Sequence, residues 1–175
     1  MKINKQRLLN IGRIFISLMF LLLTLPTWAG EGDNHLTLNA GFLFNSTINA
    51  SFGLEHQLKY DNAVEIFGEV GNRWQRDPVC GKICRDVFWK KYYWSGGVLY
   101  KKNLRRYKNS NLRLGVGAHA GAYRHKYQFG LDADLEYIIT LGNDVKLSIT
   151  QKNQVNFFHG DTFKNGLMLG IKIPI

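Results

Sequence analysis

Proline is scarce in this sequence, and no linker, internal repeat or low-complexity segment divides it. Only three prolines occur among its 175 residues, and Pro26 lies near the N-terminus. The chain therefore offers no boundary between two large domains, and its length suits a single folded unit. What it has instead is glycine, at 18 positions, together with 13% aromatic residues. Glycine mixed with tyrosine, tryptophan and phenylalanine indicates β structure with close side-chain packing.

The sequence also lacks an apolar run long enough to span a membrane as a helix. Its longest run, residues 14–25, is short of the roughly 20 residues that a span needs. Basic residues precede this run and a small-residue exit at Ala29 follows it, which is the pattern of a Sec-type signal peptide. We expect cleavage near Ala29, so that residues 1–29 are the signal peptide and residues 30–175 the mature domain. A membrane-anchor helix is the alternative; no cysteine lies near the exit, so a lipoprotein is not expected.

The excess of basic residues is not gathered in one arm of the chain. The formal net charge is +10, with 23 lysines and arginines against 13 acidic residues. Charges of both signs are spread along the mature part. This distribution suits anionic lipid headgroups or an acidic protein surface better than a segment dedicated to nucleic acid.

Apolar and polar residues alternate in eight runs after residue 30. A period of two is that of a β-strand, because successive side chains point to opposite faces. Phe67 interrupts the pattern on a polar face, and Gln151 and Asn153 interrupt it on an apolar one. The eight runs are residues 36–45, 48–58, 64–70, 92–101, 112–122, 128–139, 145–157 and 166–175.

The length of these runs predicts how the strands assemble. Most have about 9 to 13 residues, the length with which a tilted strand crosses a bilayer. Lipid leaves unpaired backbone amides unsatisfied, so the sheet must close, and the last run is expected to pair with the first. The predicted fold is all-β: an eight-stranded antiparallel up-and-down transmembrane β-barrel in the outer membrane, with turns at 60–62, 102–110 and 142–144 in the periplasm. A secreted soluble barrel or sandwich is the alternative.

The polar faces of the runs would line the barrel interior. Eight strands enclose a space that side chains fill, so a plug is expected and not an open pore. Opposed charges there should pair, because a buried unpaired charge is very costly. The acidic series on residues 132–136 could alternatively form a proton or metal site. The residues predicted for this interior charge network are Glu65, Glu69, Arg113, His119, Asp132, Asp134, Glu136, Lys152 and Lys172.

Two basic clusters are predicted outside the interior. One lies at the outer rim, where aromatic residues and cations suit lipopolysaccharide phosphates. The other lies on the turn 102–110 and is either a docking site for a periplasmic protein or a solvated loop. The rim cluster is Arg73, Trp74, Arg76, Trp89, Lys90 and Lys91, and the turn cluster is Lys101, Lys102, Arg105, Arg106 and Lys108.

Cys80 and Cys84 lie in the long connection between residues 73 and 90. In an exported protein, two close cysteines predict a structural disulfide. A redox-active pair would prefer two intervening residues at the start of a helix, and this pair has three. The five histidines show no metal-ligand spacing, no phosphate-binding loop is present, and no serine lies within the segment around His159. We therefore expect a protein that is not an enzyme and has no cofactor.

Two stretches of the sequence carry a family resemblance. They are "YYWSGGVLYKKNL…NLRLGVGAHAGAYRHK" and "YQFGLDADLEYIITLGNDVKLSITQKNQVNFFHGDTFKNGLMLGIKIPI". With their Gly-Gly strand, glycine-rich strand, acidic hairpin and terminal strand of alternating apolar residues, they resemble the TraO proteins of conjugative transposons. The likeness covers roughly residues 50–175.

The resemblance implies a non-catalytic outer-membrane component of the apparatus for conjugative DNA transfer. Its expected partners are outer-membrane lipid, lipopolysaccharide and other conjugation proteins, with no direct binding of nucleic acid. Two other functions stay open. One is a general surface barrel of adhesin-like or membrane-stabilising type, and the other is a lipid-modifying outer-membrane enzyme.

Overall fold

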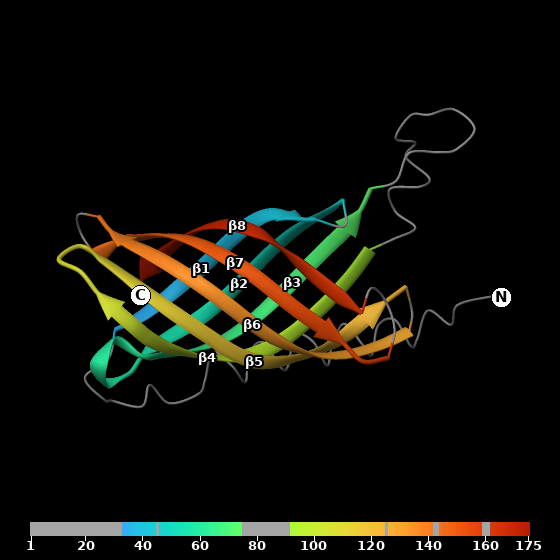
Figure 1. The fold of residues 1–175 in the computed structure, drawn as a ribbon, viewed down its shortest axis with the longest axis horizontal. Coiled ribbons are helices and arrows are strands. Elements are labelled where there is room, and N and C mark those ends of the chain that lie inside the picture. The colour runs from blue at the N-terminus through green and yellow to red at the C-terminus, as the bar shows by residue number, and fades with distance from the viewer. Residues whose placement is uncertain (1–32, 45, 75–91, 125, 142–143, 159–161) are drawn as a thin grey trace. The chain divides into compact units, whose positions relative to one another are not determined.

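A computed structural model shows an antiparallel β-barrel and describes residues 33–44, 46–74, 92–124, 126–141, 144–158 and 162–175. These residues form eight strands, and each strand pairs with its neighbours in sequence (Figure 1). The all-β, eight-stranded, antiparallel closed barrel predicted from the alternation is confirmed. The strands are β1 (Asn34–Leu43), β2 (Thr47–Gln57), β3 (Ala63–Arg73), β4 (Tyr92–Arg106), β5 (Ser110–Tyr123), β6 (Lys126–Thr140), β7 (Lys146–Asn156) and β8 (Phe163–Pro174).

The barrel closes between its first and last strands. β1 and β8 are antiparallel, with Leu36 opposite Ile173 and Leu43 opposite Gly166. The backbone N–H of Ile175 donates to the Asn34 carbonyl at 3.0 Å, so pairing continues beyond the assigned strands. The predicted partnership of the last run with the first is therefore confirmed. We call the end of the barrel where β1 begins and β8 ends the terminal end, and the opposite end the loop end.

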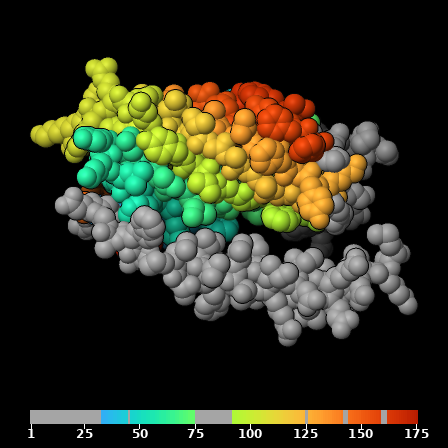
Figure 2. Space-filling model, turned by 90° about the horizontal axis from the view of Figure 1, so that it is seen from below, coloured from blue at the N-terminus to red at the C-terminus, as the bar shows by residue number. Residues whose placement is uncertain are grey.

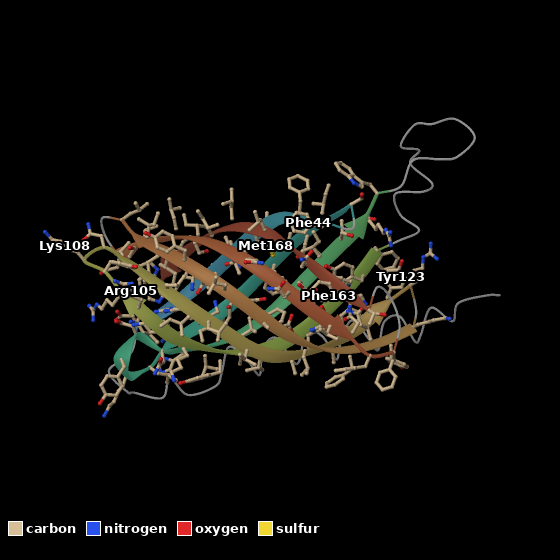
Figure 3. The ribbon with its side chains drawn as sticks, in the orientation of Figure 1. Phe44, Arg105, Lys108, Tyr123, Phe163 and Met168 are labelled. Carbon is tan, nitrogen blue, oxygen red and sulfur yellow. The ribbon has the colours of Figure 1, made fainter. Side chains whose placement is uncertain are left out.

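The two faces of the sheet have opposite chemistry. Large apolar side chains point outward, and Leu169, for example, is 66% exposed, whereas the interior holds charges such as Lys172 at 0%. Met168 lies inside among the polar side chains (Figure 3). A water-soluble domain has the reverse distribution, with its apolar side chains inside. None of the described helices has the length and hydropathy to cross a membrane.

The connection between β4 and β5 differs from the prediction. A turn was expected over residues 102–110, but β4 continues to Arg106 and β5 begins at Ser110. A bulge between Asn103 and Arg105 shifts the register and lets the ladder continue. The resulting hairpin extends beyond the neighbouring strands at the terminal end (Figure 2). The polar character of residues 102–106 therefore marks exposed strand, and the turn itself is only residues 107–109.

At the terminal end, β4 continues past the start of β3, and a short 3₁₀ turn lies beside this part of β4. This turn, η1 (Lys59–Asp61), lies in the β2–β3 connection, and two of its residues have positive φ. The neighbouring Asn62 accepts a hydrogen bond on Oδ1 from the backbone N–H of Asn103 at 3.0 Å. Covering a strand edge in this way removes a donor that another chain could otherwise pair with.

Phe67 interrupts the alternation for a packing reason. Its side chain points into the interior and is 5% exposed. Gly97 on β4 lies directly opposite, and a Cβ atom there would come within 2.8 Å of the Phe67 ring. The missing side chain at Gly97 makes room for the ring, over which Lys152 Nζ sits at 4.8 Å from the centroid.

Candidate functional site

The interior at the terminal end holds a group of buried charges, which we call the terminal-end cluster. Each member is at most 5% exposed, and three carboxylates face three cations. The group as a whole is therefore neutral, as buried charges need to be. Its members are Glu55 on β2, Glu65 on β3, Lys101 on β4, Arg113 on β5, Glu136 on β6 and Lys172 on β8.

Glu55 is the centre of the terminal-end cluster. Its Oε1 accepts a hydrogen bond from Arg113 Nη1 at 2.8 Å, and its Oε2 accepts one from Lys101 Nζ at 3.0 Å. Lys172 Nζ donates to the same Oε2 and lies 2.9 Å from Glu136 Oε1. These bonds join strands that are not neighbours in the sheet, such as β2 with β5 and β6 with β8. They brace the barrel across its interior.

A second group, the loop-end cluster, combines charges with amides. Glu69 Oε1 accepts hydrogen bonds from Ser95 Oγ at 2.6 Å and Gln154 Nε2 at 2.8 Å, and Lys152 Nζ lies 2.8 Å from Oε2. Gln154 Nε2 also donates to Asp132 Oδ1 at 2.8 Å and thereby links two carboxylates. The cluster consists of Glu69 on β3, His119 on β5, Asp132 on β6 and Lys152, Gln154 and Asn156 on β7.

His119 lies between two oxygen acceptors in the loop-end cluster. Its Nδ1 is 2.6 Å from Asp132 Oδ2, and its Nε2 is 2.9 Å from Asn156 Oδ1. The Gln128 Nε2 atom lies 3.3 Å from the same Nε2, and the donor or acceptor role of each ring nitrogen depends on the tautomer. Gly130 on β6 lies opposite, where a Cβ atom would approach the ring to 2.6 Å. A side chain at position 130 would therefore collide with the His119 ring.

The acidic series on β6 does not gather into one site. Asp132 contacts His119, Glu136 contacts two lysines, and Asp134 accepts a hydrogen bond from the backbone N–H of Asn153 at 3.3 Å. Within the described residues, no group of three histidine, cysteine or acidic side chains is placed to hold a metal ion. Of the two predicted roles, this geometry favours ion pairing over a shared proton or metal site.

The His119–Asp132 pair resembles part of a catalytic triad, but none of the residues that the structure describes places a nucleophile beside it. The second nitrogen of the ring faces the Asn156 amide and not a hydroxyl, while the Ser95 hydroxyl donates to Glu69. A cavity of about 20 Å³ lies between the two clusters, which is enough for about one water molecule. This arrangement ties strands together and fills the interior.

The predicted turn cluster divides into an interior residue and an exposed group. Lys101 is 5% exposed and belongs to the terminal-end cluster, so its assignment to the turn was wrong. The cause is the alternation itself, which continues through Lys101 and turns its side chain inward. Lys102, Arg105, Arg106 and Lys108 are exposed on the hairpin, as predicted. Arg105 and Lys108 lie at its end, away from the barrel (Figure 3).

The exposed hairpin residues make few contacts within the barrel. Arg106 Nη1 lies 3.0 Å from Asp61 Oδ2, with the arginine side chain 71% exposed. The Arg105 guanidinium lies 5.1 Å from the centroid of the Tyr107 ring. Such exposed pairs contribute little to stability, so these cations are available to another molecule.

The structure describes only part of the predicted rim cluster. Arg73 ends β3 at the loop end and Trp74 follows it, with the Trp74 ring 6.3 Å from that of Phe42. The other rim residues and the proposed disulfide lie outside the described residues: Arg76, Trp89, Lys90, Lys91, Cys80 and Cys84.

Several interior polar residues were not among the predicted site residues. They include the charged Glu55 as well as uncharged side chains, and their inward position in the alternation was the one available signal. Asn49, for example, donates from Nδ2 to Tyr93 Oη at 2.6 Å and to Glu69 Oε2 at 3.2 Å. Gln128 donates from Nε2 to Asn156 Oδ1 at 2.7 Å. Such partners follow from how the closed barrel places distant strands across from one another.

The chain was compared with protein-family models, curated proteins and solved structures, and none of them matches it.

Proposed function

We propose that this chain is an outer-membrane β-barrel that serves conjugative DNA transfer without catalysing a reaction. The observation that carries the membrane location is the inverted distribution of side chains. Apolar residues cover the outside of the closed sheet, while the terminal-end and loop-end clusters fill the inside. An exterior of this kind is stable in lipid and is an aggregation hazard in water.

The proposed role in transfer rests on the resemblance of residues 50–175 to the TraO family. The interior clusters support a structural role, because their charges are paired with one another and the cavity between them, about 20 Å³, has room for only about one water molecule. Contact with other proteins would then occur at the ends of the barrel. The exposed cations of the β4–β5 hairpin are the best candidates on the described residues, and an acidic periplasmic surface is the partner that they fit.

Membrane location is tested by cell fractionation and by gel mobility. We expect the mature chain in the outer-membrane fraction, with an N-terminus at Gly30. Its gel mobility should change after boiling, as the mobility of closed barrels does. Recovery of a freely soluble protein from the periplasm would refute the membrane location and with it the transfer role.

The transfer role is tested by deleting the gene in a donor strain and measuring conjugation frequency. We expect a large loss that the wild-type gene restores. A Lys102→Ala/Arg105→Ala/Lys108→Ala variant should insert normally but restore transfer poorly, and Lys59→Ala on the β2–β3 connection is the matched control. Unchanged transfer in the deletion strain would favour a general surface barrel, and altered lipid A in that strain would favour a lipid-modifying enzyme.

A further inference from the structure

Three carboxamide side chains lie on the outer wall of the barrel. The other outward-facing residues of β7 and β8 are apolar. Asn153 on β7 is the direct cross-strand partner of Asn165 on β8. Gln151 lies two residues from Asn153 along β7 and points to the same face. We call these three residues the amide patch.

Large apolar side chains surround the amide patch. Phe129 and Phe157 stack on each other at 6.0 Å between ring centroids, and Phe163 begins β8 two residues before Asn165. These three aromatic residues lie nearer the loop end than the patch does. In a membrane barrel, aromatic residues of this kind mark the interface, so the patch would face hydrocarbon. Its apolar neighbours are Leu131, Leu135, Ile149, Val155, Leu167 and Leu169, which are all exposed.

The hydrogen-bonding groups of the patch are only partly used within the chain. Asn153 donates from Nδ2 to the Ala133 carbonyl at 2.9 Å. The side-chain amides of Gln151 and Asn165 have no hydrogen-bond partner in the described part of the chain. In water, these unpaired amides would carry no cost, because water molecules would form hydrogen bonds with them. In lipid, an amide without a partner bears the full cost of desolvation, because hydrocarbon replaces none of the hydrogen bonds that water would make.

We propose that the amide patch is the contact between two copies of this chain in the outer membrane. The inference rests on the proposed membrane location. A carboxamide carries both donors and acceptors, so the patch is complementary to itself. All copies insert in the same direction, so a two-fold axis along the membrane normal brings patch against patch. Lipid tails offer no hydrogen bonds, and another membrane-spanning wall is what reaches this depth.

The contact is tested first by cross-linking in outer membranes. In a Cys80→Ser/Cys84→Ser background, Asn165→Cys should form a disulfide-linked dimer on mild oxidation. Val98→Cys, on β4 at the far side of the barrel, is the matched control and should stay monomeric. Equal cross-linking at both positions would mean random collision and would overturn the proposal. Cross-linking of Asn165→Cys to a different protein would overturn it in favour of a hetero-contact.

The role of the amides is tested by replacing them with leucine. The Gln151→Leu/Asn165→Leu variant should insert and fold, because leucine suits a lipid-facing position. The mass of the protein in each lipid nanodisc should fall from that of two copies to that of one. Val155→Leu, beside the patch, should remain two copies. A wild-type protein that is inserted but monomeric would overturn the dimer and leave the membrane location intact. A protein that does not insert at all would overturn both.

Discussion

In the terminal-end cluster, Glu55 meets three cations directly, whereas in the loop-end cluster Glu69 meets one lysine and reaches Asp132 through the amide of Gln154. The first arrangement concentrates charge on one side chain. The second spreads the contacts over neutral groups. Both join strands across the interior, so they do the same structural task by different means.

The difference predicts how each half of the barrel responds to a substitution. A buried charge that loses its partner stays buried, because the closed sheet leaves no path to water, and the cost of such a defect is high. A neutral amide that loses its partner costs less. The terminal end should therefore be sensitive to single substitutions and the loop end more tolerant.

The largest effect is expected for Glu55→Gln. The substitution keeps the size of the side chain but leaves Lys101, Arg113 and Lys172 with one carboxylate fewer. We expect a loss of about 3–5 kcal/mol in the free energy of unfolding, measured by urea titration in lipid vesicles. Glu65→Gln is the control and should cost less, because among the described residues Glu65 meets one cation, Lys101, and otherwise accepts a hydrogen bond from the neutral Thr37 hydroxyl. Equal losses of unfolding free energy for the two variants would contradict the central role of Glu55 in the terminal-end cluster.

Asp132→Asn should have an intermediate effect. It removes the charge opposite His119 but keeps a group that can accept a hydrogen bond from the ring. We expect a loss of about 1.5–3 kcal/mol by the same titration, as for other hydrogen bonds to charged groups. A cost above that of Glu55→Gln would contradict the proposed difference between the two ends.

Gln154→Leu tests the bridging amide itself. The leucine removes one donor from each of two carboxylates, which keep Lys152, Ser95 and His119 as partners. We expect a loss of about 1–2 kcal/mol. Complete failure to fold would show that the bridge, and not the ion pairs, holds the loop end together.

Arg106→Ala should have the smallest effect, because the Arg106 side chain is 71% exposed where it pairs with Asp61. We expect a change of less than about 1 kcal/mol in unfolding free energy. A larger loss would mean that η1 contributes to closing the β4 edge through this pair.

The fold could be predicted from the sequence because alternation reports directly which face each residue takes. All eight runs became strands. The prediction failed where polar residues could belong either to a loop or to an exposed part of a strand. The cations of residues 102–106 were assigned to a turn because charged residues are common in loops, yet they continue β4 with one bulge. Phe67 broke the pattern because a glycine on the next strand makes room for it.

The sequence by itself determined the strands and the sorting of polar and apolar side chains, because both follow from the two-residue period of a single strand. The tertiary structure alone decided which charges meet. Lys172 and Glu55 are separated by more than a hundred residues and come together only when β8 pairs with β1. Closure sets the distances across the interior, and those distances select three cations for Glu55 and an amide bridge for Glu69.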